Sequence, residues 1–297
     1  MSTGRWHRLR LPLRVPLAGR DYRDVGLLEG PSGWGEASPL PGYPADPDLC
    51  ARAAEEAAWG SWPVPRREEV AVNALVPAVA AAEAEALAAH AVAEGFTTVK
   101  VKVGDRDDVD RVAAVRSAAG PGARLRVDAN GGWDVEEAVA AIARLAPFDL
   151  ELVEQPVASL DDLAGVRRRV AVPVAADECV RSVTDARRLA ALQAADAVVL
   201  KVQPLGGVAA ALEVAGEAGV PAIVTSMYET SVGLAAGLAL AAALPDLPWA
   251  CGLGTAALLA ADVVADPLLP VRGVLAVRRP QPEPDLLARY AREEVGR

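Results

Sequence analysis

The stretch Thr98-Val99-Lys100-Val101-Lys102-Val103 decides the fold class, because it has the pattern of a strand with two unlike faces. Side chains alternate along a strand, so the two lysines share one face and the three valines share the other. A valine face suits packing against a layer of helices, whereas lysines that face the interior of a barrel need anionic partners. We therefore predict one strand of a parallel α/β fold here, with its lysines turned toward a functional site.

Four more charged residues follow Lys102 at nearly regular intervals. Asp128, Glu154, Asp177 and Lys201 come after gaps of 26, 26, 23 and 24 residues, each about the length of one strand–loop–helix–loop unit. Equivalent points of successive units in a closed barrel converge on one site. The five residues are therefore expected to lie together at one end of a barrel.

The three acids are predicted to lie at the carboxyl ends of strands. Each ends an apolar run and is shortly followed by an N-cap residue with an acid three positions later, which is a signal for the first turn of a helix. These pairs are Asp134 with Glu137, Ser159 with Asp162, and Ser182 with Asp185. The carboxyl ends of the strands form the catalytic face of barrels of this type.

Composition limits the alternatives. At 297 residues and 52% hydrophobic content, the chain can bury a large core and hold one barrel with a smaller element. A net charge of −10 argues against nucleic acid or an anionic membrane as the partner, because phosphate binding draws its energy from clustered Lys and Arg. Pro or a charge interrupts every apolar stretch before about 20 residues, so no membrane insertion is expected. The basic N-terminus has no apolar signal core behind it, which predicts a cytoplasmic protein.

The sulfur and imidazole groups offer little chemistry. Cys50, Cys179 and Cys251 are widely spaced and odd in number, which suits reduced thiols better than disulfides or a zinc site. The two histidines, His7 and His90, lie outside the run of charged residues, so a histidine triad or a His-rich metal site has almost no material. Acid–base chemistry must therefore fall to Lys, Asp or Glu.

Two domains are expected. Residues 1–70, with strand-like pieces at 9–13 and 22–29, a Gly/Pro-rich loop at 33–43 and a helix near 49–58, are predicted to form an α+β capping domain. The tail from about 270 to 297 is predicted to complete it, with the strand-like residues 273–277 paired to the N-terminal part. Residues 71–269 are predicted to form the catalytic barrel.

Three carboxylates on neighbouring strands suit a hard divalent cation, with Mg²⁺ as the default and Mn²⁺ as an alternative. A metal bound to a substrate carboxylate would stabilise the negative charge formed when the neighbouring carbon loses a proton, and flanking ammonium groups could move that proton. A lysine that acts as the base must first be neutral. Burial, the metal and the second cation Lys100 are each expected to lower its pKa.

The motifs around these residues resemble the enolase superfamily, in particular its muconate-lactonising branch, and Lys or His bases with Mg²⁺ are the general pattern of that superfamily. The motifs are Lys100-Val101-Lys102, Asp128-Ala129-Asn130, Glu154-Gln155-Pro156, Asp177-Glu178 and Lys201-Val202-Gln203-Pro204. The resemblance implies a modified (β/α)7β TIM-type barrel with an N-terminal α+β capping domain, completed by the C-terminal tail. It also implies that the loop around Gly35 to Tyr43 closes the site.

The resemblance also assigns roles. Asp128, Glu154 and Asp177 would bind Mg²⁺. Lys102 would remove the proton alpha to the carboxylate of a small-molecule substrate and then protonate the departing hydroxyl, while Lys201 on the opposite face would stabilise the enediolate.

Supporting roles are expected for five further residues, Lys100, Arg126, Asn130, Glu178 and Ser226. Arg126 could orient the charged groups, or it could simply pair with a neighbouring acid. Asn130 and Glu178 could hold the metal ligands in place, or serve only as turn or cap residues. Ser226 could donate a hydrogen bond to a substrate carboxylate.

Within the branch, residues 33–43 and Gly252-Leu253-Gly254-Thr255 resemble the o-succinylbenzoate synthase family. That resemblance implies a metal-dependent dehydratase, a carbon–oxygen lyase of menaquinone biosynthesis that acts by proton abstraction and beta-elimination of water. An N-acyl amino acid racemase or dipeptide epimerase would use the same lysine pair, and the barrel motifs do not separate the two. A barrel that binds ligand without turnover would hardly retain both lysines and all three acids. The oligomeric state is left open.

Overall fold

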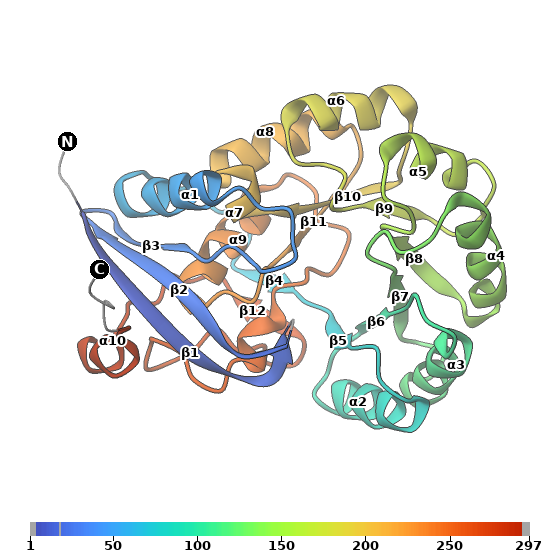
Figure 1. Ribbon diagram of the computed structural model, residues 1–297, viewed down its shortest axis with the longest axis horizontal. Coiled ribbons are helices and arrows are strands. Elements are labelled where there is room, and N and C mark those ends of the chain that lie inside the picture. The colour runs from blue at the N-terminus through green and yellow to red at the C-terminus, as the bar shows by residue number, and fades with distance from the viewer. Residues whose placement is uncertain (1–3, 18, 293–297) are drawn as a thin grey trace.

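The computed structural model describes residues 4–17 and 19–292 (Figure 1). Parts of the expected capping domain, residues 1–3, 18 and 293–297, lie outside the described residues. A small antiparallel sheet from the N-terminus lies beside a larger, curled parallel sheet, and helices α2 to α6 cover the outside of the curled sheet (Figure 1). The predicted class, an α/β barrel with an N-terminal α+β part, is confirmed.

The N-terminal sheet has the order β1-β2-β3, built from β1 (Arg5–Leu17), β2 (Arg20–Gly30) and β3 (Gly33–Ala37). Helix α1 (Pro47–Trp59) packs on β2 and β3. The interpretation of residues 33–43 as one loop is wrong, since its first five residues form β3. Gly35 resembles a turn residue in sequence, but here its missing side chain lets the strand approach α1, because a Cβ would collide with the backbone of Ala54.

The parallel sheet contains seven strands in sequence order, so each strand pairs with the next one along the chain. They are β5 (Ala74–Val76), β6 (Thr98–Lys102), β7 (Arg124–Asp128), β8 (Leu150–Glu154), β9 (Val174–Ala176), β10 (Ala197–Lys201) and β11 (Ala222–Thr225). Val99 and Val101 of β6 are fully buried against the helix layer, as the opening stretch predicted. The lysines of β6 therefore face the barrel interior.

The connecting helices begin where the sequence signals placed them. Asp134 with Glu137 forms a capping box, and Ser159 and Ser182 each accept a hydrogen bond from the amide three residues on. The helices are α2 (Ala81–Ala93), α3 (Asp108–Ala119), α4 (Val135–Leu145), α5 (Leu160–Arg167), α6 (Val183–Leu192), α7 (Val202–Leu205), α8 (Val208–Ala218) and α9 (Ser231–Ala243). Two short 3₁₀ turns accompany them, η1 (Ala146–Phe148) and η2 (Gly254–Leu258).

Residues 250–252 close the barrel. The amide of Gly252 donates to the Val224 carbonyl at 2.8 Å on one side, while Cys251 exchanges hydrogen bonds with Ala71 and Asn73 on the other. These bonds join β11 to the chain just before β5. Strand β4 (Glu69–Ala71), which precedes β5 by two residues, does not join the barrel sheet and pairs elsewhere.

The C-terminal tail returns to the earlier part of the chain. Strand β12 (Val274–Ala276) pairs antiparallel with β4, so the partner of the predicted strand is the end of the N-terminal segment rather than the β1–β3 sheet. Helix α10 (Pro284–Tyr290) packs on β1 with Leu287 in the core of the small sheet (Figure 1). All three cysteines are free thiols. Within the described ranges, every helix is too short or too polar to cross a membrane.

Candidate active site at the carboxyl ends of the barrel strands

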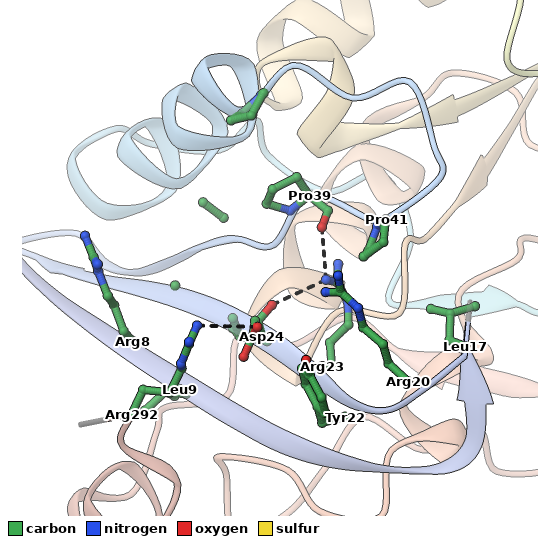
Figure 2. A pocket seen from close by; sticks show the side chains of 14 residues that line it. Arg8, Leu9, Leu17, Arg20, Tyr22, Arg23, Asp24, Pro39, Pro41 and Arg292 are labelled. Carbon is green, nitrogen blue, oxygen red and sulfur yellow. Dashed lines mark hydrogen bonds and ion pairs between the residues drawn. The ribbon is translucent and has the colours of Figure 1, made fainter. Parts of the chain in front are cut away.

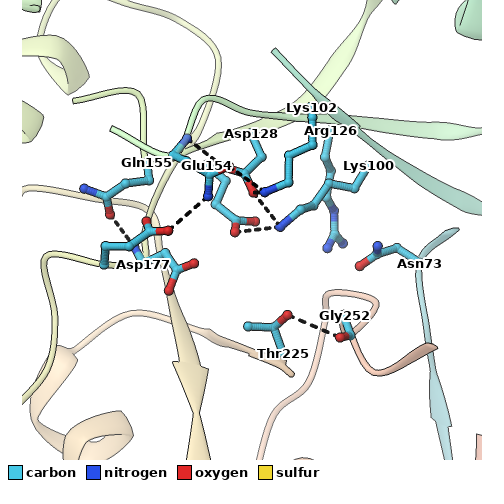
Figure 3. A network of polar contacts seen from close by, with 12 residues as sticks. Asn73, Lys100, Lys102, Arg126, Asp128, Glu154, Gln155, Asp177, Thr225 and Gly252 are labelled. Atoms are coloured by element: carbon cyan, nitrogen blue, oxygen red, sulfur yellow. Dashed lines mark hydrogen bonds and ion pairs between the residues drawn. The ribbon is translucent and has the colours of Figure 1, made fainter. Parts of the chain in front are cut away.

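The five predicted residues converge at one end of the barrel. Each of Lys102, Asp128, Glu154 and Lys201 is the last residue of its strand, and Asp177 follows β9 directly. The three carboxylates and Lys201 are buried, whereas the Lys102 side chain keeps 29% of its surface exposed. Figure 3 shows the lysines of β6 pointing toward the acids of β7 and β8.

Lys100 lies between two of the acids. Its Nζ is 2.8 Å from Asp128 Oδ2 and 2.7 Å from Glu154 Oε1, so oxygens from two adjacent strands share one cationic partner. Burial disfavours the charged form of Lys100, but attraction to Asp128 and Glu154 outweighs it and raises the pKa of this lysine. Burial likewise opposes charge on Asp128, yet the nearby lysines hold the pKa of that carboxyl well below its usual range.

Lys102 has two oxygen partners on the exposed side of the cluster. Its Nζ donates to Asp128 Oδ2 and to Asn130 Oδ1, both at 2.6 Å. Asn130 adopts a left-handed backbone conformation (φ 46°), and its Nδ2 donates to Glu178 Oε1 at 3.0 Å. Asn130 therefore contacts both Lys102 and Glu178 and connects these two residues.

Lys201 and Asp177 form the second ion pair, in which the Lys201 ammonium contacts both oxygens of Asp177. Burial opposes the charge of Lys201, but attraction to Asp177 outweighs it and raises the pKa of Lys201. Tyr43 reaches this pair from the N-terminal part of the chain. Its hydroxyl donates to Asp177 Oδ1 at 3.2 Å, and the Lys201 Nζ lies 4.5 Å from the centre of its ring. Sequence reasoning quoted Tyr43 within the closing loop but gave it no role.

Two supporting residues have other partners. Arg126 is fully buried, pairs with Glu151 (Nε to Oε2, 2.5 Å) and donates to the Ala250 carbonyl at 2.7 Å. Pairing with a neighbouring acid was one of the two alternatives for Arg126. The Ser226 hydroxyl lies 2.8 Å from both the Gly252 carbonyl and the Thr255 hydroxyl, which ties the end of β11 to the closing residues.

The donor set fits a hard divalent cation. Asp128, Glu154 and Asp177 offer carboxylate oxygens from three adjacent strand ends, and two of them already converge on the Lys100 ammonium. Asp177 is turned toward Lys201. In this arrangement no three His, Cys, Asp or Glu side chains of the described residues converge closely enough to bind one ion. Binding a metal would therefore require the carboxylates to exchange ammonium partners for the cation.

The segment Ser38–Tyr43, here called the capping segment, connects β3 toward α1 and carries Tyr43 to the site. A cavity of about 450 Å³ lies between this segment and the β1–β2 hairpin, with Arg23, Pro39 and Pro41 in its lining (Figure 2). Its walls come from the N-terminal part of the chain and from Arg292 of the C-terminal tail. The cavity is therefore separate from the lysines and carboxylates.

A second buried polar cluster lies beneath the capping segment, and sequence reasoning missed its acidic pair. Glu36 at β3 and Glu229 before α9 are each 4% exposed. Burial and the charge of Glu229 raise the pKa of Glu36 to about 7, and burial also raises the pKa of Glu229. The one sequence signal was a glutamate within an otherwise apolar, glycine-containing segment, Glu36. It indicates a buried acid only if the segment is already known to be a strand.

Comparison with known proteins agrees with this geometry. A family model described as enolase C-terminal domain-like matches residues 82–283, and one described as enolase N-terminal domain-like matches residues 9–58. The chain belongs to the enolase superfamily. Among solved structures, muconate lactonizing enzyme from Pseudomonas putida superposes with a TM-score of 0.85 at 23% identity, covering 98% of this chain and 99% of that one. At that identity the likeness shows the fold alone.

Curated relatives within the superfamily are considerably closer. The o-succinylbenzoate synthase of Thermobifida fusca is 56% identical over 91% of this chain and 86% of that protein. The o-succinylbenzoate synthase of Mycobacterium tuberculosis is 48% identical over 94% of this chain and 86% of its own length. The chain is therefore an enzyme of the carbon–oxygen lyase type that these relatives represent. The solved L-Ala-D/L-Glu epimerase of Bacillus subtilis has a TM-score of 0.83 at 26% identity, over 94% of this chain and 96% of that one.

Proposed function

We propose that the chain is a metal-dependent dehydratase that forms o-succinylbenzoate in menaquinone biosynthesis. The observation that carries the proposal is the placement of Lys102 and Lys201 on either side of three carboxylates, in a chain whose relatives bear that enzyme's name. Strands β7, β8 and β9 lie between the two lysine-bearing strands, so a substrate above them would be exposed to a lysine amino group from each side.

Asp128, Glu154 and Asp177 would hold the cation, with Mg²⁺ as the proposed ion and Mn²⁺ as an alternative. When bound, such an ion supplies positive charge beside the substrate carboxylate and makes negative charge there less costly. Asn130 would keep Asp128 oriented, because the backbone N–H of Asn130 donates to Asp128 Oδ1 at 3.0 Å. Glu178 would in turn fix Asn130 through the contact between their side chains.

Lys102 would move the proton. Its side chain is the more exposed of the two β6 lysines, so it can reach a small carboxylate that enters from solvent. As the base, it would take the proton alpha to the carboxylate, and as the acid it would return a proton to the leaving hydroxyl. Lys100 lies deeper and would supply positive charge beside it. Lys201, buried and charged, would stabilise the enediolate from the opposite side.

A racemase or epimerase of N-acyl amino acids or dipeptides is the second candidate. The placement of one lysine on each side also suits removal of a proton from one face and its return to the other. The fold is shared with the Bacillus subtilis epimerase, whose identity to this chain is about half that of the Thermobifida fusca synthase. We therefore rank epimerisation second, as a side activity or an alternative.

The deciding experiment is a substrate panel on the purified protein. The protein would be supplied with Mg²⁺ and assayed with the o-succinylbenzoate precursor, with N-acyl amino acids and with dipeptides, each before and after exhaustive chelation. We expect turnover of the precursor with the largest kcat/KM, and loss of that turnover on chelation. Efficient epimerisation with no dehydration would favour the second candidate, and full turnover after chelation would contradict the metal.

We also propose that residues 1–70 and about 270–297 form the capping domain around a catalytic barrel of residues 71–269, in a cytoplasmic protein. Support comes from the tail, since Arg292 N donates to the Arg8 carbonyl at 2.8 Å and Leu287 packs with the leucines of β1. Truncation after Pro270 is expected to cause aggregation or loss of cooperative unfolding. A soluble truncated protein with an unchanged melting curve would count against this division.

A further inference from the structure

The capping segment begins on a buried amide group supplied by the barrel. Gln203 is 3% exposed, and its Oε1 accepts from the Ser38 amide at 2.7 Å. Its Nε2 donates to the Ser38 hydroxyl at 3.1 Å and faces Glu229 Oε1 at 3.4 Å. Because only the amide oxygen can accept from a backbone N–H, these bonds fix the orientation of the Gln203 side chain. One side chain therefore binds both the main chain and the side chain of Ser38.

The other side of the same junction is held from the N-terminal sheet. Arg23, buried in β2, donates to the Pro39 carbonyl (Figure 2). It also donates to the carbonyls of Ser38 and Met227, and so bridges the capping segment and the barrel. The Ser38 hydroxyl donates a hydrogen bond to Glu36 Oε1 at 2.6 Å. Ser38 is therefore held by three side chains, from β2, β3 and α7.

Glu36 extends this junction to helix α9. Its Oε2 accepts from the Thr230 hydroxyl at 2.5 Å, the Thr230 amide at 3.1 Å and the Gly233 amide at 3.0 Å. A carboxylate of the N-terminal sheet thus satisfies first-turn N–H groups of a barrel helix. Gln203 contacts the same segment from another part of the barrel, next to the end of β10 that carries Lys201.

That position has a consequence for the site. Gln203 is two residues after Lys201, so the short helix α7 that directly follows the lysine also holds the start of the capping segment. At the far end of the segment, Tyr43 contacts the Lys201–Asp177 pair. The chain thus forms a closed path from Lys201 through Gln203, Ser38 and Tyr43 back to Lys201.

We propose that Gln203 is a positioning residue that seats the capping segment on the barrel and thereby places Tyr43 over Lys201. The inference rests on the proposed function in giving Lys201 a role in turnover. Removing the Gln203 amide would leave the Ser38 N–H buried without its acceptor, and the segment can relieve that cost by moving into water. Tyr43 would then leave the ion pair, with Gln203 itself touching no substrate.

The first test measures seating without any substrate. Gln203→Met keeps a long unbranched side chain but deletes the two hydrogen bonds with Ser38 and the one to Glu229. Hydrogen–deuterium exchange read by mass spectrometry should accelerate at the Ser38 and Tyr43 amides by at least about tenfold, the factor that corresponds to roughly 1.4 kcal/mol, within the range for one lost buried hydrogen bond. Exchange in β7 and β8 should stay unchanged. Unaltered exchange over the segment would overturn the proposal.

A matched control separates seating from general destabilisation. Asp196 lies before β10, at the end of the barrel opposite the site, and accepts from the Val174 amide at 2.9 Å and from Arg167. Asp196→Asn also disturbs polar contacts of the barrel, but we expect no change in exchange over the capping segment and no change in KM. If it accelerated exchange there as much as Gln203→Met, the effect would be global and the proposal would be wrong.

The second test is a double-mutant cycle in turnover, using whichever substrate of the panel the wild type converts. Gln203→Met and Tyr43→Ala should each lower kcat/KM by about tenfold, and the double variant should fall no further than Tyr43→Ala alone. Multiplied losses would show independent roles and overturn the proposal. If Gln203→Met does not fold, Ser38→Ala removes the hydroxyl contacts with Gln203 and Glu36 but keeps the amide bond to Gln203, and it should give a smaller change in the same direction.

The two ideas can fail separately. A wild type that converts no substrate of the panel would contradict the proposed function, while the exchange experiment would still decide whether Gln203 seats the segment. A wild type that converts the precursor, with variants that match it in exchange and in kcat/KM, would contradict only the role of Gln203.

Discussion

Two groups of buried carboxylates, those of the strand ends and those beneath the capping segment, are equally removed from water but are stabilised in different ways. Asp128, Glu154 and Asp177 contact lysine ammonium groups, which match their charge. Arg23 favours the charged form of both Glu36 and Glu229, and Lys201 also favours that of Glu229, but the hydrogen bonds of the two carboxylates come from backbone, hydroxyl and amide donors.

The difference is clearest between Asp128 and Glu36, because burial raises the pKa of Glu154 and of Asp177 as well. The lysines lower the pKa of Asp128, whereas burial and mutual repulsion raise the pKa of Glu36 to about 7. The strand-end acids are thus balanced by positive charge, as a cation site requires. The pair beneath the capping segment favours holding a proton, which suits a structural junction. The same residue type performs both tasks because its neighbours differ.

The largest expected effect breaks the charge balance of the strand-end cluster. Lys102→Ala should lower turnover by at least roughly 10²-fold, the lower end of what a positioned acid–base group supplies, and should abolish exchange of the substrate's alpha proton with solvent deuterium. Lys201→Arg keeps the charge and should retain a trace of dehydration while losing racemisation that needs a second base. Alpha-proton exchange at the wild-type rate in Lys102→Ala would assign the base to Lys201 instead.

A metal titration compares the two carboxylate groups directly. Glu154→Gln should remove most affinity for Mg²⁺ or Mn²⁺, because it deletes one of three charges while preserving shape. Glu36→Gln should leave the affinity within about twofold of wild type, since it lies outside the strand-end cluster. Isothermal titration calorimetry checks both. Equal loss of affinity in the two variants would contradict the assignment of metal binding to the strand-end carboxylates alone.

Stability against pH tests the proton on the junction. The folded pKa of Glu36 is about 7 and its ordinary value is 4.5, so the folded state binds the proton more tightly than the unfolded state. The stabilisation is fully present below pH 4.5 and is lost as the pH rises through about 7, amounting to about 3 kcal/mol.

Glu36→Gln should remove this dependence. The difference in unfolding free energy between variant and wild type, measured with urea, should therefore shift in favour of the variant as the pH rises. The charged or titratable groups that influence Glu36 include Glu229 and Arg23, and Cys50 lies close enough to Arg23 and Glu229 to interact with both. A constant difference from pH 4.5 to 8 would contradict the raised pKa of Glu36.

The smallest expected effect sharpens the contact between the two regions. Tyr43→Phe keeps the ring beside Lys201 but deletes the hydrogen bond to Asp177. A fall in kcat of about three- to fivefold is expected, in the range of one modest hydrogen bond. The comparison is with Tyr43→Ala, whose loss should be larger because the ring is gone as well. Identical losses would mean that the ring contributes nothing.

Much of the barrel could be predicted because its signals are local. Strands β7 and β8 end at the acids that were predicted to lie at strand ends, since an apolar run ending in a charged residue is visible in sequence. Helix starts at Asp134, Ser159 and Ser182 were equally readable, because capping links residues three apart. The five charged residues of the site inherit this regularity.

What escaped prediction depends on contacts between distant parts of the chain. Strand β3 was not predicted because Gly35 was interpreted as a turn residue. Its role is instead to let the strand pack closely against α1. Residues 250–252, which close the barrel, are too few to show a period. Gln203 and Ser38 are 165 residues apart, and neither carries a local pattern that would point to the other.

The proline content of the capping segment has a consequence for how it opens. Pro39 and Pro41 lie within it and Pro44 follows directly, so few backbone amides there need a partner and the released chain has few conformations to gain. The free-energy difference between the position seen here and a released position would then contain neither a large gain in chain entropy nor a large loss of main-chain hydrogen bonds. A handful of side-chain contacts can set that equilibrium, and a bound substrate needs only modest differential affinity to shift it.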